Sequence, residues 1–541
     1  MKLFNHKKIA ILTLAAMTFA GCGDFLDEEN RSGVSIETAL ADAETFDQLV
    51  ANVYEVSREY TTHYTADMYY TLEDLGTDLV TRGTSVSGTD EINDYVNVNS
   101  ANWVYSVYWS DQYDIVAAAN VVISNASSVN GLSDSDVALR VGQAKFFRAW
   151  SYFNLVENFG GVPLVLEQVT TAQSNFTRAS EQDVYAQIVS DLEDALDGVE
   201  ASPADFGRVS KDAVRHLLSR VLLTRGYKSF GTSADFTKAA SYAETVIVNN
   251  PLVGSFEDLV SIDNQRNSEV VFSYLFGSNS ASRGWGNSRH MMYKFRYFDY
   301  PALSRGNLYQ KGLGPAPTPF FYTLFSDEDE RAAASFRRVI YADENSEDGS
   351  IVVGDTAIYF PKTAWPQSVI DSKPYTVINP DTYFTNNGVT VVHYPMFKKF
   401  DDPGVPFTQP DQSSQGERDM VMMRGGEAYL IAAEAYLQLN NAADAADLLT
   451  TLRSRAGIAT AVSAAEVDID FILDERAREL MGEVSRWMDL KRTGKLLERT
   501  LAHNPHAALN NALAEKHYLR PIPQTEVDNS QGTIEQNAAY K

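Results

Sequence analysis

The sequence AKFFRAWSYFNLVENFGGVPLV, residues 144–165, has the repeating apolar pattern of a packed helix and a clear end signal. Its apolar residues recur at intervals of three or four positions and fall on one helical face, at Phe146, Ala149, Phe153 and Val156. The pair Gly160-Gly161, followed by Pro163, does not continue a helix. The stretch therefore predicts a helix that ends at the glycine pair.

The same helical periodicity occurs in two further regions of the chain. Residues 211–224 and 236–248 are predicted to form one helix pair. A second pair is predicted on either side of the turn Asn440-Asn441, and it ends at Gly457. Units of this size and pattern resemble tetratricopeptide repeats, although their period is irregular. The fold class predicted from these regions is mainly α-helical.

Residues 281–410 differ in character from the helical regions on both sides. Gly, Pro, Asn and Asp interrupt every pattern, and 23 of the 61 aromatic residues of the chain fall within these 130 positions. The strand-like runs at 351–353, 357–360 and 389–394 are short and separated by turn residues. We interpret the region as a loop-rich insertion packed on the helical scaffold, where binding residues tend to concentrate.

The first thirty residues predict export and a lipid anchor. Three lysines precede an uncharged, mostly apolar run at residues 9–19, which is the layout of a secretory signal peptide. A helix of this length spans about 16 Å, too short to cross a bilayer. Cys22, the only cysteine, follows Phe19-Ala20-Gly21, which resembles a bacterial lipobox although Phe19 replaces the usual leucine. We expect Cys22 to carry the anchor; the alternative is an unmodified free cysteine.

The charge of the chain limits its partners. It has 45 basic and 72 acidic residues, a net charge of −27. Removing residues 1–21 takes away three lysines and no acids, so the mature chain has 42 basic and 72 acidic residues and a net charge of −30. Such a surface repels nucleic acid and anionic headgroups. We expect no nucleic-acid partner, and a polyanionic ligand only where a local basic pocket outweighs the average.

The residues that could carry catalysis form no recognisable constellation. No His-Glu-x-x-His or Gly-x-Ser-x-Gly motif occurs. His503 and His506 have a spacing that metal ligands can use, but the proline between them favours surface histidines. The acidic runs at 327–330 and 343–349 are interpreted as solvated loops, because neither fixes a carboxylate pair nor completes a calcium loop. We predict no enzyme activity, no metal and no cofactor.

Seven segments, in order along almost the whole chain, are similar to the SusD/RagB family of outer-membrane nutrient-binding lipoproteins. They are GCGDFLDEE (21–29), the helix and exit at 144–165, GRVSKDAVRHLLSRVLL (207–223), MRGGEAYLIAAEAYLQLN (423–440), LRSRAGI (452–458), DERARELMGEVSRWMDLKRTG (474–494), and YLRPIPQTEVDNS (518–530) with the closing QNAAY. The closing segment departs from the usual Gln-Asn-Pro-Gly-Tyr of the family.

The resemblance implies a fold, a cellular location and a function. It implies a SusD-like helical protein with four tetratricopeptide-like pairs, tethered by lipid to the outer membrane and facing the cell exterior. Such a protein sits as a hinged lid on a SusC-like TonB-dependent transporter, captures an oligosaccharide or polysaccharide and breaks no bond. Capture of a peptide or amino compound is the alternative. The expected divisions are the signal peptide at 1–21 and a domain at 22–541, made of 22–275, the insertion at 276–420, and 421–541.

The residues of these seven segments also have a structural interpretation. Four charged residues of the 474–494 segment are spaced three or four apart and are predicted to pair along one helical face: Arg476, Glu479, Glu483 and Arg486. Several aromatic and apolar motif residues are predicted to lie in the core: Trp109, Tyr152, Phe153, Phe159, Trp487 and Leu490.

The ligand contacts are expected on loops. Sugar rings present apolar faces and rims of hydroxyl groups, so a glycan site needs exposed aromatic rings beside amides, carboxylates or arginine. In proteins that this chain resembles, the site lies near the first helices and in the central insertion. Those places offer eight candidates, namely Asp78, Arg82, Trp103, Trp285, Tyr293, Arg296, Tyr297 and Trp365. Trp285 ranks first because a glycine on each side leaves its ring uncrowded; the alternative for each aromatic is core packing.

Overall fold

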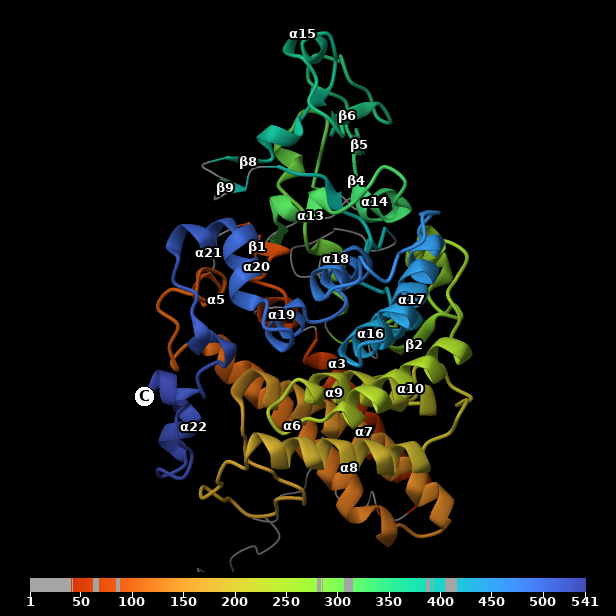
Figure 1. The fold of residues 1–541 in the computed structure, drawn as a ribbon, viewed down its shortest axis with the longest axis vertical. Helices are drawn as coiled ribbons and strands as arrows, with labels where there is room; N and C mark the ends of the chain where they lie inside the picture. The colour runs from red at the N-terminus through yellow and green to blue at the C-terminus, as the bar shows by residue number, and fades with distance from the viewer. Residues whose placement is uncertain are drawn as a thin grey trace, which may run out of the picture.

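Long helices form the broad base of the molecule, and an arm of short strands and loops rises from them (Figure 1). The computed structural model describes residues 40, 42–61, 68–83, 88–279, 284, 286–305, 315–385, 390–391, 393–403 and 416–541. The longer helices are α3 (Ala43–Glu59), α6 (Trp103–Asn125), α7 (Asp134–Phe159), α8 (Glu181–Gly198), α9 (Lys211–Gly226), α10 (Ser233–Asn249), α16 (Gly425–Gln438), α17 (Ala442–Arg455), α18 (Ile469–Leu480) and α20 (Leu496–His503).

Short helices and turns connect these elements. The short α-helices are α4 (Met68–Glu73), α5 (Thr89–Asp94), α11 (Phe256–Val260), α13 (Pro319–Thr323), α14 (Glu330–Ser335), α15 (Gln367–Ile370), α19 (Arg486–Arg492), α21 (Pro505–Asn510) and α22 (Gln524–Asn529). The described 3₁₀ turns are η2 (Ala126–Ser128), η3 (Ile262–Asn264), η4 (Arg289–Met291), η5 (Tyr297–Asp299), η6 (Pro380–Thr382), η7 (Glu515–Tyr518) and η8 (Ala538–Tyr540).

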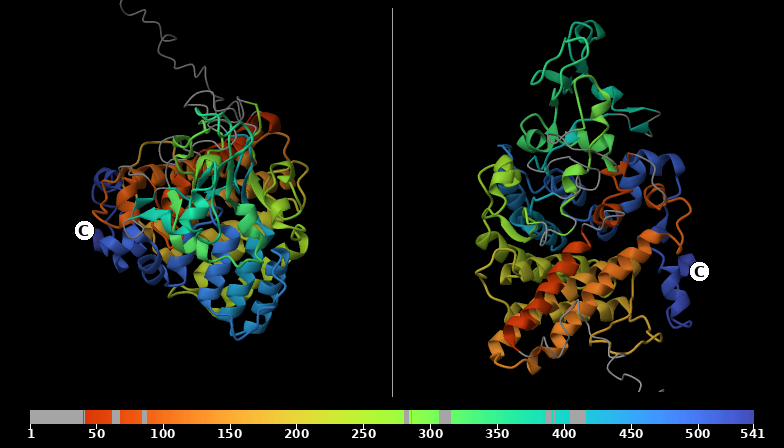
Figure 2. Two further views of the ribbon diagram at one scale, coloured as in Figure 1. Left: turned by 90° about the horizontal axis from the view of Figure 1, so that it is seen from above. Right: turned by 180° about the vertical axis from the view of Figure 1, so that it is seen from behind.

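The helices of the base follow one another as packed neighbours. α3 lies along α6, as the view from behind shows (Figure 2), and α6 to α10 each pack on the next helix in the chain. α10 then packs on α16, although all residues between 249 and 425 separate the two in sequence, and α16 packs on α17 and α18. The predicted mainly α-helical fold is confirmed, and the predicted insertion interrupts this series of helices between α10 and α16.

The helix α7 contains most of the apolar repeat at residues 144–165. Ser133 caps its N-terminus, because the Ser133 hydroxyl accepts a hydrogen bond from the Asp136 amide at 3.2 Å and the Asp136 carboxylate accepts one from the Ser133 amide at 3.1 Å. Its end at Phe159 confirms the prediction, since Gly160 has φ 76°, a conformation that favours glycine.

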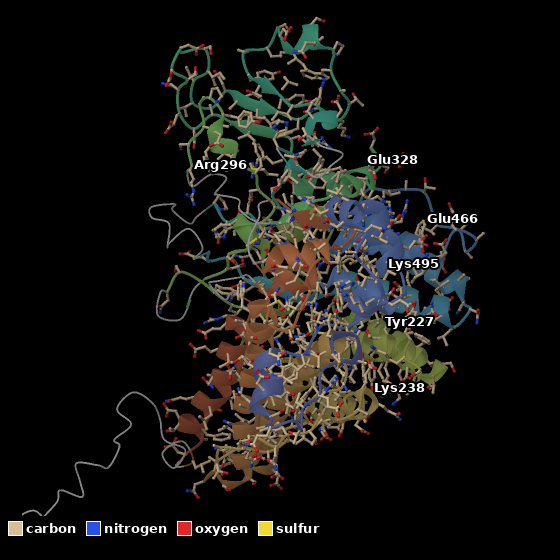
Figure 3. All side chains as sticks on the ribbon, turned by 90° about the vertical axis from the view of Figure 1, so that its left-hand side faces the viewer. Tyr227, Lys238, Arg296, Glu328, Glu466 and Lys495 are labelled. Carbon is tan, nitrogen blue, oxygen red and sulfur yellow. The ribbon has the colours of Figure 1, made fainter. Side chains whose placement is uncertain are left out.

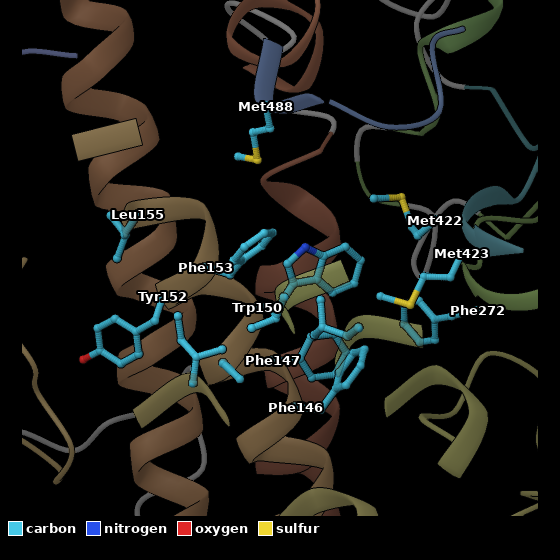
Figure 4. Close-up of a cluster of buried hydrophobic side chains, with 14 of the residues drawn as sticks. Phe146, Phe147, Trp150, Tyr152, Phe153, Leu155, Phe272, Met422, Met423 and Met488 are labelled. Carbon is cyan, nitrogen blue, oxygen red and sulfur yellow. The ribbon is translucent and has the colours of Figure 1, made fainter. Parts of the chain in front are cut away.

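The core of the base is built around α7 (Figure 4). Phe146, Phe147 and Trp150 lie with their ring centres 5.8–6.1 Å from the ring of Phe272. Phe272 belongs to β2 (Val270–Tyr274), which pairs antiparallel with β11 (Met420–Arg424), so that Val270 lies opposite Arg424 and Tyr274 opposite Met420. This two-stranded ribbon holds the two ends of the insertion side by side on the helical core.

The arm has its own small core and several short sheets. Apolar side chains from Phe295 to Met396 form a cluster separate from that of the base. The strands are β1 (Val80–Arg82) with β3 (Pro315–Pro317), β4 (Phe336–Arg337) with β10 (Met396–Phe397), β8 (Phe384–Thr385) with β9 (Thr390–Val391), and the three-stranded sheet β5 (Val339–Tyr341), β6 (Thr356–Tyr359) and β7 (Thr376–Val377). The predicted strands at 357–360 and 389–394 correspond to β6 and β9, whereas 351–353 is not a strand.

A buried network of charges joins the ribbon to the C-terminal helices. Arg424, at the end of β11, lies 2.8 Å from a carboxylate oxygen of Glu269 and 2.6 Å from those of Glu479 and Glu483. All four side chains are almost completely buried. Burial alone raises the pKa of Glu483, but Arg424 and Lys399 outweigh it and lower that pKa to about 2. The Glu483 carboxylate therefore stays ionised inside the protein.

The prediction that Arg476, Glu479, Glu483 and Arg486 pair along one helical face is wrong. The helix α18 ends at Leu480, and Gly482 follows with φ 76°, so the chain turns before α19 begins at Arg486. The four side chains are buried and bind other parts of the fold, such as Asp489, Arg424 and Asp78. The expected core positions of Trp487, Leu490, Trp109, Tyr152, Phe153 and Phe159 are confirmed.

Glu157, near the end of α7, connects α7 with α8, α19 and the turn after α9 through buried polar contacts. Its carboxylate lies 2.6 Å from Lys228 Nζ and 3.3 Å from Lys491 Nζ, and it accepts a hydrogen bond of 2.6 Å from the Tyr185 hydroxyl. Burial opposes ionisation, yet the two lysines and Tyr185 lower the pKa of Glu157 from 4.5 to about 2.

We therefore expect the stability conferred by Glu157 to depend on pH. Because its folded-state pKa is lower than the unfolded one, its contribution of about 3 kcal/mol is present above pH 4.5 and is lost as the pH falls towards 2. Urea unfolding of wild type and Glu157→Gln at several pH values measures this. The two should differ at pH 7 and converge near pH 2; a difference that stays constant with pH contradicts the assignment.

Candidate ligand-binding site

Two of the predicted functional residues lie outside the described part of the chain. Trp285, the first-ranked ligand residue, and Cys22, the expected lipid attachment site, both belong to segments that the structure does not describe. Their roles stay predictions. The other seven ligand candidates can be placed.

Asp78 is a buried structural carboxylate in this fold. It lies just before β1, fully buried, with Arg486 Nη2 at 2.7 Å and Arg499 Nε at 2.8 Å from its carboxylate. Burial alone raises its pKa, but the two guanidinium groups outweigh this and lower it. Both of its oxygens are occupied by arginine, so the expectation that Asp78 reaches a ligand does not fit its position.

Tyr293 and Tyr297 are also buried, which contradicts the expectation of exposed ring faces. The Tyr293 hydroxyl donates a hydrogen bond of 3.2 Å to Asp74, and its ring packs 5.5 Å from that of Phe397. Tyr297 begins η5 and belongs to the core cluster of the arm. The reason is their surroundings: apolar residues of the insertion fold back over both rings instead of leaving them on a loop surface.

Arg82 and Trp103 are partly exposed and lie at the two ends of the segment that contains α5. Arg82, the last residue of β1, forms a bidentate ion pair with Asp94 at 2.9 and 3.1 Å. Trp103 is the first residue of α6, whose N-terminus Asn102 caps by accepting a hydrogen bond from the Val104 amide. A Cβ atom added at Gly88 would lie 2.4 Å from Trp103 Nε1, so the indole rests directly on the Gly88 backbone.

Arg296 lies at the surface, as Figure 3 shows. Its guanidinium pairs with Asp299 at 2.7 Å and lies 5.0 Å from the ring centre of Phe298. Both charged side chains of the pair are more than half exposed. The group is available to a ligand, but nothing in its contacts connects it with Trp365.

Trp365 forms part of a partly exposed aromatic cluster near α15, at the tip of the arm (Figure 1). Its ring lies 5.1 Å from that of Tyr359, which in turn lies 6.5 Å from that of Tyr375. Lys373 Nζ lies 5.7 Å from the Trp365 ring centre. We call Tyr359, Trp365, Lys373 and Tyr375 the tip platform. It combines flat apolar rings with a hydrogen-bond donor, the two features that sugar binding requires.

Local structure fixes Trp365 in this position. The Asn379 side chain accepts a hydrogen bond from the Trp365 amide at 2.9 Å and donates one to the Trp365 carbonyl at 3.0 Å. The parallel pairing of β6 and β7 sets Tyr359 opposite Val377, close to Tyr375. Four residues that form or support this cluster are absent from the sequence-based predictions: Tyr359, Lys373, Tyr375 and Asn379. For Tyr359, the strand-like run at 357–360 is the available signal.

Histidines and acidic runs behave differently from the sequence-based interpretation at two points. His506 is buried, not on the surface, and its Nδ1 lies 2.7 Å from the Thr81 hydroxyl. Asp329 of the acidic run at 327–330 is buried too, because it caps α14 and pairs with Arg331 at 2.8 Å. Within the described ranges, no group of three or more His, Cys, Asp or Glu side chains is arranged to hold a metal ion. Among the helices described, none combines the length and apolarity needed to cross a bilayer.

The comparisons with known proteins all indicate the same family. A family model described as "SusD family" matches residues 268–540, and one described as "Starch-binding associating with outer membrane" matches residues 24–223. SusD-like protein P2 of Formosa agariphila is 25% identical over 562 residues, which cover 98% of this chain and 99% of that protein.

Two proteins of Bacteroides thetaiotaomicron show the same likeness. The starch-binding protein SusD is 25% identical over 438 residues, 76% of this chain and 74% of that protein. The solved structure of surface glycan-binding protein A in complex with laminarihexaose has a TM-score of 0.69 at 17% identity, and the match covers 92% of this chain and 100% of that one. The latter similarity concerns the fold.

Proposed function

Because this chain belongs to the SusD family, we propose that it binds a glycan at the cell surface and delivers it to a SusC-like TonB-dependent transporter. The structural observation that carries the proposal is the tip platform, with three partly exposed rings and a lysine on a projecting arm. Relatives named as starch-binding or glycan-binding proteins support carbohydrate as the ligand class. The work of the protein is binding, without cleavage of the glycan.

The tip platform can recognise a sugar through two kinds of contact. The faces of Trp365 and Tyr359 offer apolar surface for the C–H face of a pyranose ring. Lys373 and the Tyr359 hydroxyl can hydrogen-bond to the sugar hydroxyl groups at the edge of that ring. Since neither Trp365 nor Tyr375 is fully buried, a sugar can reach these groups without unfolding of the arm.

The rest of the proposal concerns the cellular location of the protein and its transporter partner. Cys22 serves as the lipid attachment site after removal of residues 1–21, which places the mature chain on the outer membrane, facing outwards. The chain then acts as a lid that closes over the transporter with the glycan bound. Four further contacts are proposed: Trp285 and Arg296 in the insertion at 276–420, and Arg82 and Trp103 before it.

We expect the change Trp365→Ala to weaken glycan binding roughly tenfold, which corresponds to about 1.4 kcal/mol. The physical reason is loss of the indole ring that lies against both Tyr359 and Lys373 in the tip platform. Affinity gel electrophoresis of residues 23–541 in laminarin, starch, mannan and alginate measures this, with Trp285→Ala tested in parallel. Val369→Ala, an exposed apolar change on the nearby α15, is the matched control and should leave migration unchanged.

The outcomes separate the proposed function from its alternative. Retardation of wild type by one polymer, reduced in Trp365→Ala, supports glycan capture at the arm. Retardation that Trp365→Ala leaves unchanged while Trp285→Ala abolishes it moves the site away from the tip platform. Absence of retardation by every polymer counts against glycan capture and favours a peptide or amino compound, which isothermal titration with short peptides then tests.

A further inference from the structure

A groove in the base is lined on one side by α3. The view from behind shows this helix at the front of the base (Figure 2). The groove has a volume of about 370 Å³, and its lining comes from α3, from the turn at residues 206–208 and from the end of β2. This volume lies within the range of pockets that hold small ligands. The groove belongs to the helical base and shares no lining residue with the tip platform.

The groove contains an arginine whose charge is not neutralised by a carboxylate. Arg208 lies with its guanidinium carbon 5.1 Å from the ring centre of Tyr54. Among the described residues, no carboxylate lies within ion-pair distance of Arg208, unlike Arg82, Arg148 or Arg220. The Tyr54 hydroxyl is already engaged, because it donates to Gln143 at 2.6 Å and accepts from the Val209 amide at 3.0 Å. A cation thus lines the groove in a chain whose net charge is −27.

A second arginine, Arg58, also lines the groove, and Arg266 lies beside its Phe206 wall. Arg58 lines the groove and donates a hydrogen bond of 3.1 Å to the Leu275 carbonyl. Arg266 lies with its guanidinium carbon 5.2 Å from the ring centre of Phe206, and it lies 3.3 Å from the Asp419 carboxylate. The lining contains one carboxylate, the exposed Glu55. The lining thus carries two guanidinium groups, of Arg58 and Arg208, beside this one carboxylate.

A buried hydroxyl in the same lining is also without a partner. Ser273 is 1% exposed, and its hydroxyl has no hydrogen-bond partner among the described residues. A buried hydroxyl that makes no hydrogen bond is unfavourable unless a water molecule or a ligand satisfies it. Ser273, the aromatic rings of Tyr54 and Phe206 and the guanidinium of Arg208 thus bring a donor, flat apolar faces and a cation together in one groove.

We propose that this groove is a second ligand site, which binds a sugar-sized molecule carrying a carboxylate, such as a uronic acid. Arg208 pairs with the carboxylate, the Tyr54 and Phe206 rings contact the apolar face of the sugar, and the Ser273 hydroxyl bonds to a ring oxygen or hydroxyl. The planar guanidinium suits the two oxygens of a carboxylate. The proposal is independent of glycan capture at the tip platform.

Gly207 gives the turn the shape that the groove requires. It has φ 86°, and a Cβ atom added there would lie 2.9 Å from the Leu275 side chain. Glycine therefore allows the turn to pack directly on the end of β2, so that Arg208 and Ser273 line the same groove.

The test is titration calorimetry of residues 23–541 with D-glucuronate, and with D-glucose and acetate at equal ionic strength as reference ligands. We expect glucuronate to bind more tightly than either, and Arg208→Gln to lower its affinity at least tenfold. Lys238→Gln, which removes an exposed cation of α10 outside both the groove and the tip platform, should leave it unchanged. Glu55→Gln should raise the affinity for glucuronate severalfold, because it removes a repelling charge from an exposed position.

Each outcome bears on the proposal. Loss of glucuronate binding in Arg208→Gln together with a gain in Glu55→Gln supports it. Equal binding of acetate and glucuronate overturns the sugar assignment, and equal binding of glucose overturns the carboxylate assignment. No binding of glucuronate, or binding that neither variant alters, overturns the site. If Arg208→Gln lowers the melting temperature, the exposed Glu55→Gln variant alone decides between these outcomes.

Discussion

Replacing Arg424 with methionine is expected to lower the free energy of unfolding by about 3–5 kcal/mol. The change leaves the buried carboxylates of Glu479, Glu483 and Glu269 without the cation that lies 2.6–2.8 Å from them. Lys399 and Arg455 also belong to this network, but each contacts only part of it. Urea unfolding at pH 7 and the melting temperature measure the loss.

The matched control is Arg296→Met, which removes an arginine from an exposed ion pair. Such pairs contribute little, so its effect should stay within about 0.5 kcal/mol. An Arg424→Met protein as stable as the control would show that water or other side chains neutralise the three carboxylates. The ribbon of β2 and β11 would then be held by its other contacts, such as the packing of Phe272 on α7 and the Arg220 hydrogen bond to the Met422 carbonyl.

The second large effect is expected for Asp78→Ala, again about 3–5 kcal/mol of unfolding free energy. This change leaves Arg486 and Arg499 buried without their shared carboxylate. Thermal unfolding measures the loss, and gel retardation at low temperature measures binding on the same sample. Since Asp78 is buried, we expect the glycan affinity of the folded variant to equal that of wild type.

Asp299→Ala provides the comparison, because Asp299 also pairs with an arginine but is exposed. It should leave the melting temperature almost unchanged. Loss of affinity in Asp78→Ala with an unchanged melting temperature would restore Asp78 to the ligand-binding residues. That result would mean that the carboxylate becomes accessible when a glycan binds.

The scaffold could be predicted from the sequence because its signals are local. Apolar residues repeat with helical spacing in α7, α9, α10, α16 and α17, and glycine or asparagine marks several of their ends. The segment at 474–494 was misinterpreted for an equally local reason. Its charged residues keep helical spacing through Gly482, and spacing alone does not show that the glycine adopts a positive φ and ends the helix.

The candidate site was harder to predict because burial in a loop-rich region depends on distant contacts. Tyr293 and Trp365 both follow turn residues and look alike in sequence, yet one is buried beside Asp74 and the other lies on the tip of the arm. The tip platform depends on the pairing of β6 with β7, which joins residues 18 positions apart, such as Tyr359 and Val377, and on the Asn379 hydrogen bonds to Trp365. Ion-pair partners such as Asp78 and Arg486, distant in sequence, leave no periodic pattern.

The ribbon of β2 and β11 allows the outer part of the arm to vary independently of the helical base. Because the chain leaves the helical series after α10 and returns to it at α16 through two paired strands, the outer part of the arm can vary in length and composition while the helices keep their neighbours. Arg331 and Lys399 do not belong to this part, since they bind carboxylates of the base. Under the proposed function, changes in the sequence of the arm can alter the ligand while the scaffold stays the same. For the same reason, grafting the arm of one relative onto the base of another, with the junction at the ribbon, is a way to design binding specificity.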